Sequence, residues 1–204
     1  MSHPIIKHRY TDFGKDKLEI ARYLVNYKDV FSMKEIYTLL HEWLVDEGYA
    51  TRADEKLPEV GYILRDNPTF GKELWIRWRV TKIPEETSKL WRYDLDIDFH
   101  TLGLKEVEFV HKGTKLKADK GEVEVAVVAN LIIDYEKAWQ KHPFWKKYKD
   151  FIINKFFRDK LNFHKNELQK DAIRFQEAIK TYLKIETYLS SREFQEFHPK
   201  RPPE

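Results

Sequence analysis

The sequence predicts an α+β fold: an antiparallel sheet of four or five strands, with an N-terminal helix and two C-terminal helices packed on one face. Three observations lead to this prediction. A capped segment near the N-terminus has apolar residues at helical spacing, the middle of the chain alternates apolar and polar residues, and the last third returns to helical spacing. We expect residues 1–204 to form a single domain, with loose ends at about 1–10 and 196–204.

Composition excludes several classes of protein. Aromatic residues make up 15% of the chain, a content that intrinsically disordered proteins lack. No apolar run reaches the roughly 18 residues that a membrane-spanning helix needs, so an integral membrane protein is not expected. The chain has no cysteine, which rules out disulfides, cysteine-bound zinc and thiol nucleophiles. No secretory signal is readable, and a cytoplasmic location is therefore expected.

The first two elements differ in how clearly the sequence defines them. Residues 17–28 fit either a strand or a short helix. Ser32 and Glu35 form a capping box, and Gly48 is typical of the position just after a helix ends. Between them, apolar residues recur on one helical face: Ile36, Leu39, Leu40, Trp43 and Leu44. We therefore expect a helix at 33–47.

The middle of the chain predicts strands. A polar loop with Pro58 and Pro68 is expected first. Strict alternation at 73–82 and 93–101 then predicts two half-buried strands of an antiparallel sheet. Further strands are expected at 105–112 and 122–133, with turns at 111–114 and 119–121, where glycine follows lysine.

The chain after Tyr135 predicts two helices. From about 165 to 189, apolar residues with a seven-residue rhythm indicate a long amphipathic helix that crosses the sheet or pairs with another helix. The preceding helix carries a stripe of mostly aromatic residues: Trp139, Phe144, Tyr148, Phe151, Ile152 and Phe156.

The first of these helices also supplies the candidate binding surface. Ten basic and three acidic residues give 137–170 a net charge of +7, whereas the whole chain carries +3. Rings interleaved with lysines suit an anionic lipid surface or single-stranded nucleic acid, and a protein partner is a further alternative. The simpler interpretation is that the rings cover the sheet and the lysines face water. The candidate binding residues are Lys141, Trp145, Lys146, Lys147, Lys149, Lys155 and Arg158.

A row of carboxylates on one predicted strand raises the question of a metal. Asp94, Asp96, Asp98 and His100 share a face and are the candidate ligands. Phe99 occupies the sixth position, where a calcium-binding EF-hand loop needs glycine. The simpler interpretation is a charged sheet face with Arg77 and Arg79 opposite the aspartates as cross-strand pairs.

Three functional hypotheses follow, and no cofactor is expected under the first. The sequence contains no nucleophile elbow, phosphate-binding glycine loop or dinucleotide-binding fingerprint, so we favour a non-enzymatic binding or scaffold protein with a basic, aromatic C-terminal helical surface. One alternative is a helix-grip container for an apolar ligand. The other is a divalent-metal enzyme that uses the Asp94, Asp96 and Asp98 face.

Three segments of the chain also carry a resemblance. They read FSMKEIY at 31–37, HEWL at 41–44 and KGEVEV at 120–125. Together they resemble an uncharacterised family of archaeal proteins, and the similarity extends along most of the chain. The resemblance implies a prokaryotic, cytoplasmic setting and brings with it no activity, cofactor or site residue.

Overall fold

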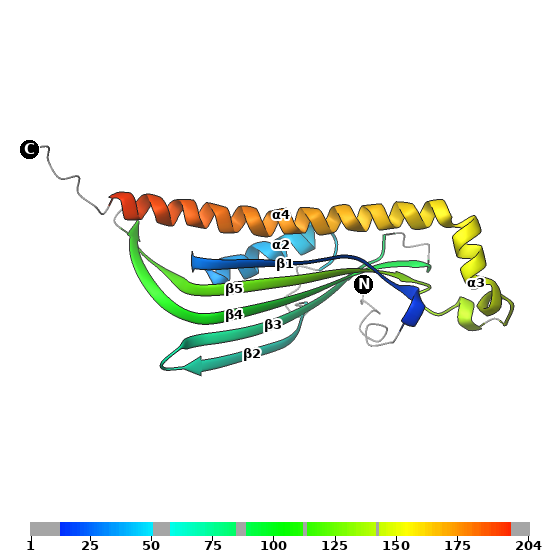
Figure 1. The fold of residues 1–204 in the computed structure, drawn as a ribbon, viewed down its shortest axis with the longest axis horizontal. Helices are drawn as coiled ribbons and strands as arrows, with labels where there is room; N and C mark the ends of the chain where they lie inside the picture. The colour runs from blue at the N-terminus through cyan, green and yellow to red at the C-terminus, as the bar shows by residue number, and fades with distance from the viewer. Residues whose placement is uncertain (1–12, 51–57, 85–88, 112–113, 142, 197–204) are drawn as a thin grey trace, which may run out of the picture.

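Five antiparallel strands and three α-helices form the fold in the computed structural model, as the sequence predicts for an α+β protein (Figure 1). The structure describes residues 13–50, 58–84, 89–111, 114–141 and 143–196, without the side chains of 109–111, 114–116, 145, 146 and 184–196. In chain order the elements are η1 (Gly14–Asp16), β1 (Lys17–Phe31), α2 (Met33–Asp46), β2 (Glu59–Asn67), β3 (Gly71–Lys82), β4 (Trp91–His111), β5 (Thr114–Ile133), η3 (Trp139–Lys141), α3 (Pro143–Phe156) and α4 (Arg158–Glu196).

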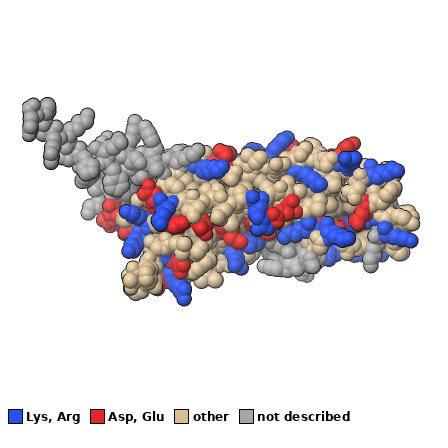
Figure 2. All heavy atoms as spheres, in the orientation of Figure 1, with Lys and Arg blue, Asp and Glu red and all other residues tan. Residues whose placement is uncertain are grey.

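The strand order in the sheet is β1-β5-β4-β3-β2, and all neighbours are antiparallel. Strands β2 to β5 form a meander, and β1 adds to its far side beside β5. The helix α4 runs along the sheet, with α2 beside it on the same side (Figure 1). Charged side chains of both signs are mixed along the flank of the molecule (Figure 2).

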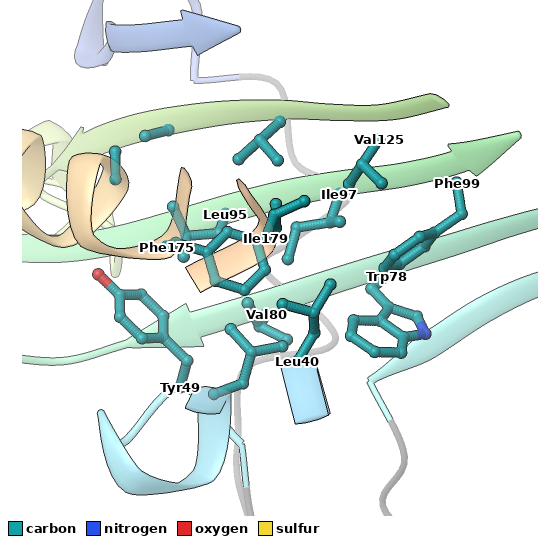
Figure 3. Close-up of a cluster of buried hydrophobic side chains, with 14 of the residues drawn as sticks. Leu40, Tyr49, Trp78, Val80, Leu95, Ile97, Phe99, Val125, Phe175 and Ile179 are labelled. Atoms are coloured by element: carbon teal, nitrogen blue, oxygen red, sulfur yellow. The ribbon is translucent and has the colours of Figure 1, made fainter. Parts of the chain in front are cut away.

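The core lies between one face of the sheet and the helices α2 and α4. Alternation places Trp78, Leu95 and Ile97 on this face, where all three are completely buried. Phe175 of α4 and Leu40 of α2 pack against them from the helix layer (Figure 3). The period-two segments at 73–82 and 93–101 therefore do form half-buried strands, as the sequence predicts.

The helix α2 begins and ends close to where its capping residues predict. The Ser32 hydroxyl accepts a hydrogen bond from the Glu35 amide at 3.3 Å. At the other end Gly48 has φ +78°, the left-handed region that glycine favours. The next amide, of Tyr49, donates to the Leu44 carbonyl oxygen at 2.7 Å, which closes the helix with a Schellman motif.

The strands β1 and β2 differ from the sequence prediction. Residues 17–28 belong to a strand, β1, which removes the ambiguity between strand and helix. The expected loop with Pro58 and Pro68 contains the whole of β2. Alternation did not reveal β2 because nearly all of its residues are half or fully exposed, so neither of its faces had to be consistently apolar.

The predicted strand at 105–112 is the far part of β4, and the predicted turn at 119–121 lies inside β5. Glycine marks a bend here rather than a turn. Gly103 has φ +63°, and the pairing of β4 with β5 shifts register between Leu102 and Lys105. A Cβ on Gly121 would come within 2.9 Å of the Leu102 carbonyl oxygen, so the two strands approach closely at this irregularity.

We predict that Ser32→Ala lowers the free energy of unfolding by about 0.5–2 kcal/mol, because the Glu35 amide loses its acceptor at the helix N-terminus. Thr38→Ala is the matched control. Thr38 is exposed in the middle of the same helix, where alanine is the better helix former. Denaturant unfolding of both variants measures the difference, and equal midpoints would contradict the capping role of Ser32.

We also predict that stability falls between about pH 10 and about pH 12. Burial raises the pKa of Tyr37 to about 12, with a smaller contribution from Glu59, and burial likewise raises the pKa of Tyr23 and of Tyr49. The unfolded chain therefore releases these protons at lower pH than the folded protein does, so rising pH favours unfolding. Urea midpoints measured across this range test the prediction, and a midpoint independent of pH would contradict it.

Candidate functional site

The helix α3 projects at one end of the sheet and meets α4 at a sharp corner (Figure 1). Pro143 is its first residue, a position where proline needs no amide hydrogen. At its other end the Phe157 amide donates to the carbonyl oxygens of Ile152 and Ile153, at 3.3 and 3.2 Å. Leu161 then donates to the Phe157 carbonyl oxygen at 2.8 Å, which starts α4 in the new direction.

A buried ion cluster fixes the inner side of α3. The Lys149 side chain lies 2.7 Å from Asp16 and 3.3 Å from Asp134, measured from Nζ to a carboxylate oxygen. Asp134 is buried, has φ +52°, and also accepts a hydrogen bond from the Trp139 amide at 3.2 Å. The cluster thus joins η1, the chain after β5 and α3.

Lys149 is therefore not part of the candidate binding surface, contrary to the sequence prediction. Only 6% of the residue is exposed. A buried ammonium group is retained only where carboxylates compensate its charge, and Asp16 and Asp134 do so here.

The outer side of α3 exposes its aromatic rings. Four of these rings form a surface that we call the aromatic stripe. The simpler interpretation, in which the rings cover the sheet, is wrong for all four. Neighbouring rings contact each other, with centroids 5.0 Å apart for the first two and 6.4 Å apart for the last two. The stripe consists of Phe144, Tyr148, Phe151 and Phe156, which are 61%, 41%, 55% and 71% exposed.

Exposed cations flank the aromatic stripe. Lys147 lies over the Tyr148 ring, with Nζ 5.7 Å from the ring centroid, and Lys155 lies over the Phe151 ring at 5.2 Å. A shallow hollow of about 430 Å³ beside Phe151 is lined partly by Lys155 and Arg158. Lys141 is exposed at the start of the region, and the side chains of Trp145 and Lys146 lie outside the described residues. Lysine and arginine gather around this end of the molecule (Figure 2).

The aspartate row on β4 is held by arginines. The guanidinium of Arg79 lies 2.6 Å from Asp98 and 3.5 Å from Asp96, which confirms the predicted cross-strand pairs. Asp94 differs from the other two because it is buried, where Arg92 donates two hydrogen bonds to it at 2.7 and 2.8 Å.

The fourth candidate ligand, His100, is also engaged within the sheet. It stacks on Trp75 with ring centroids 5.1 Å apart, and its ring nitrogens lie 3.8 and 3.7 Å from Glu73 and Glu124. Among the residues that the structure describes, no group of three or more His, Asp or Glu side chains is placed to hold a metal ion. The geometry therefore gives the metal-enzyme hypothesis no support.

The container hypothesis needs space between α4 and the sheet. At the centre of this layer Leu95, Ile97 and Phe175 are completely buried, and Ile179 is nearly so. Side chains from α4 and from the sheet fill this part of the layer (Figure 3). The packing observed there leaves the aromatic stripe as the better candidate site.

The comparisons with known proteins add no relationship: the sequence matches no protein-family model and no curated protein. Within the described part of the chain, no helix has the length and apolar content needed to cross a membrane.

Sequence reasoning identified the surface but assigned its residues incompletely. It missed Asp16 and Asp134, which lie far from Lys149 in the sequence and become neighbours only through the fold. One signal was present: Lys149 and the apolar Ile153 are four residues apart and so share a helical face. A lysine on the apolar face of a helix indicates a buried partner of opposite charge.

We predict that Lys149→Met destabilises the protein by about 3–5 kcal/mol, because Asp16 and Asp134 would keep buried charge without a cation. Lys147→Met, two residues earlier on the exposed side, should change stability by less than about 0.5 kcal/mol. Thermal or denaturant unfolding of the two variants provides the comparison. Similar stabilities for both would show that the ion cluster does not hold α3.

Proposed function

We propose that this protein is a non-enzymatic binding protein that attaches reversibly to anionic membrane surfaces through α3. One observation carries the proposal: a projecting helix, fixed on its inner side, exposes four rings in two contacting pairs and is flanked by exposed cations. Soluble proteins seldom expose a contiguous apolar patch of this kind without a partner for it. Rings at the depth of the headgroups and cations toward anionic lipid are the usual arrangement of an interfacial helix.

The arrangement of the rings favours lipid over single-stranded nucleic acid. Proteins that bind single strands track the backbone along a positively charged groove and stack successive bases on aromatic rings. Here the rings stand on the outside of a helix at the end of the molecule, and the hollow beside Phe151 also contains the acidic Asp150. In addition, Phe144 packs against Tyr148, and Phe151 against Phe156, so ring edges already contact each other.

The expected strength of binding is modest. Each basic residue near a membrane rich in anionic lipid contributes about 1 kcal/mol, so Lys141, Lys147, Lys155 and Arg158 together supply about 4 kcal/mol. Insertion of the exposed rings adds an apolar contribution that salt does not screen. Because α3 is already folded and anchored, binding need not include the cost of ordering a helix.

Vesicle co-sedimentation tests the proposal. We predict that the protein sediments with phosphatidylcholine vesicles containing about 30% phosphatidylserine, much less with pure phosphatidylcholine, and less as salt rises from about 50 to about 500 mM. The double variant Phe144→Ser, Phe151→Ser should lose most of the binding at every salt concentration. Phe70→Ser is the matched control, because Phe70 is 74% exposed but lies between β2 and β3.

A charge variant separates the contribution of the basic residues from that of the inserted rings. Lys147→Glu combined with Lys155→Glu should abolish the dependence on phosphatidylserine, whereas Lys34→Glu combined with Lys72→Glu makes the same change on exposed residues of α2 and β3. Equal loss in both pairs, or in Phe70→Ser, would reject α3 as the site. Binding to an oligothymidylate but to no vesicle would replace lipid by single-stranded nucleic acid as the partner.

A further inference from the structure

The face of the sheet opposite α2 and α4 carries a groove, which we call the open-face groove. It has a volume of about 870 Å³, within the range of pockets that bind small organic molecules. The strands β2 and β3 supply most of its lining, and the starts of β1 and β4 supply the rest. Its described lining shares no residue with the aromatic stripe of α3.

The register between β2 and β3 gives the groove its open space and its apolar surface. Gly61 lies opposite Arg77, and a Cβ on Gly61 would stand 3.9 Å from the Cβ of Arg77, an ordinary contact, so this position has room for a larger group. Two residues further along β2, Ile63 lies opposite Trp75. Ile63 is 62% exposed, and the half-buried Trp75 ring stacks on His100 with centroids 5.1 Å apart. Together Ile63 and Trp75 offer an apolar surface to a ligand.

The carboxylates that line the groove are already engaged by the sheet itself. Arg92, which is completely buried, donates two hydrogen bonds to Asp94 at 2.7 and 2.8 Å. Asp96 lies 3.5 Å from Arg79 and accepts a hydrogen bond from Asn130 at 3.3 Å. A cationic ligand would therefore have to compete with contacts that the fold already makes.

Two arginines of the groove have hydrogen-bond donors to spare. The Arg77 side chain is 67% exposed and lies 4.0 Å from Asp98, and the Arg65 side chain is 73% exposed and lies 3.9 Å from Glu73. Both distances are too long for a hydrogen bond, and in the described part of the chain neither guanidinium donates one. A guanidinium binds a carboxylate or phosphate group through two parallel hydrogen bonds, so the open-face groove is suited to an anion.

Of the two arginines, Arg77 has the better surroundings for an anion. Arg65 lies directly opposite Glu73, whose negative charge repels an anionic group. Arg77 instead has a glycine opposite it on β2. Its neighbour on β4 is Asp98, whose charge Arg79 compensates at 2.6 Å.

We infer that the open-face groove binds a small organic anion with a planar apolar body. The body lies against Trp75 and Ile63, and its carboxylate or phosphate group accepts hydrogen bonds from Arg77. A long polyanion such as a nucleic-acid strand is disfavoured, because Glu73 and Glu124, on either side of the neighbouring His100, would repel its further phosphates.

Calorimetric titration with four matched probes tests the inference. 2-Naphthoate and 2-naphthyl phosphate combine the ring with each anionic group, naphthalene-2-methanol has the ring alone, and acetate has the charge alone. We expect at least one of the two naphthyl anions to bind with a Kd below about 1 mM. The other two probes should bind at least about tenfold more weakly, because each lacks one of the two contacts. The naphthyl anion that binds more tightly identifies the anionic group.

Variants locate the bound probe. Arg77→Gln should weaken binding of the naphthyl anion at least about tenfold, since it removes the charged donors. Gly61→Leu should weaken it similarly by filling the open space, on an exposed strand where a larger side chain is tolerated. Arg22→Gln is the matched control, because Arg22 is a similarly exposed arginine on the same face, in β1. Unchanged denaturation midpoints show that the variants are folded. The indole N–H resonance of Trp75, assigned with Trp75→Phe, should shift when the probe is added.

Several results would overturn the inference. They are the absence of binding by either naphthyl anion at millimolar concentration, equal binding of naphthalene-2-methanol, and equal affinities of Arg77→Gln and Arg22→Gln. Binding that is lost in the double variant Phe144→Ser, Phe151→Ser but kept in Arg77→Gln would place the probe on the aromatic stripe instead. Tighter binding of an oligothymidylate through Arg77 would make a nucleic-acid strand the occupant and would also overturn the inference. Vesicle binding through α3 enters none of these measurements.

Discussion

The apolar face of the sheet must be covered, and the packing of α4 against it is the interaction on which the rest of the structure depends. Leu168, Phe175 and Ile179 lie on one side of α4, and each is buried or nearly so against the sheet. Burial of this layer is the main favourable contribution to folding, since each large side chain contributes about 1.5–3 kcal/mol. The opposite face of the sheet has no such cover among the described elements, and it carries the arginine and aspartate pairs.

Because one long helix covers most of the apolar face of the sheet, exposed apolar surfaces occur where that helix does not reach. A helix lying along the sheet reaches β1, β5 and part of β4, and α2 extends the cover toward β3 through contacts such as Tyr37 with Trp78. The helix α2 reaches only the start of the last strand, β2, where the Tyr37 hydroxyl donates to Glu59 at 3.0 Å; the rest of the described strand lies beyond both helices. At the end of the sheet the chain must also turn back from β5 into α4, and α3 occupies that turn, where only its inner side has neighbours to pack against.

The parts of the fold that could be predicted from the sequence are those whose burial is one-sided. The strand β3 alternates, and α2 has one apolar stripe and both of its caps, so the bounds of these two elements were readable within one or two residues. Alternation also located β4 and β5, but it predicted β4 as two strands and began β5 eight residues late. The strand β2 gave no such pattern, because burial does not distinguish its faces. The segment around Gly121 was taken for a turn, because glycine at a close approach of two strands has the same sequence signature.

The candidate site was predictable in composition but not in orientation. Spacing identified a helix with rings and lysines, and it could not decide which of them point inward. The ion cluster decides this. A rotation of α3 that turned its rings toward the core would remove Lys149 from Asp16 and Asp134, and it would also expose Ile153, which is buried on the inner side. A buried ion pair contributes little net stability, because desolvation offsets most of the attraction, but separating its charges costs several kcal/mol. The cluster therefore acts on the direction of α3 more than on its stability, and it holds the aromatic stripe outward where a partner can reach it.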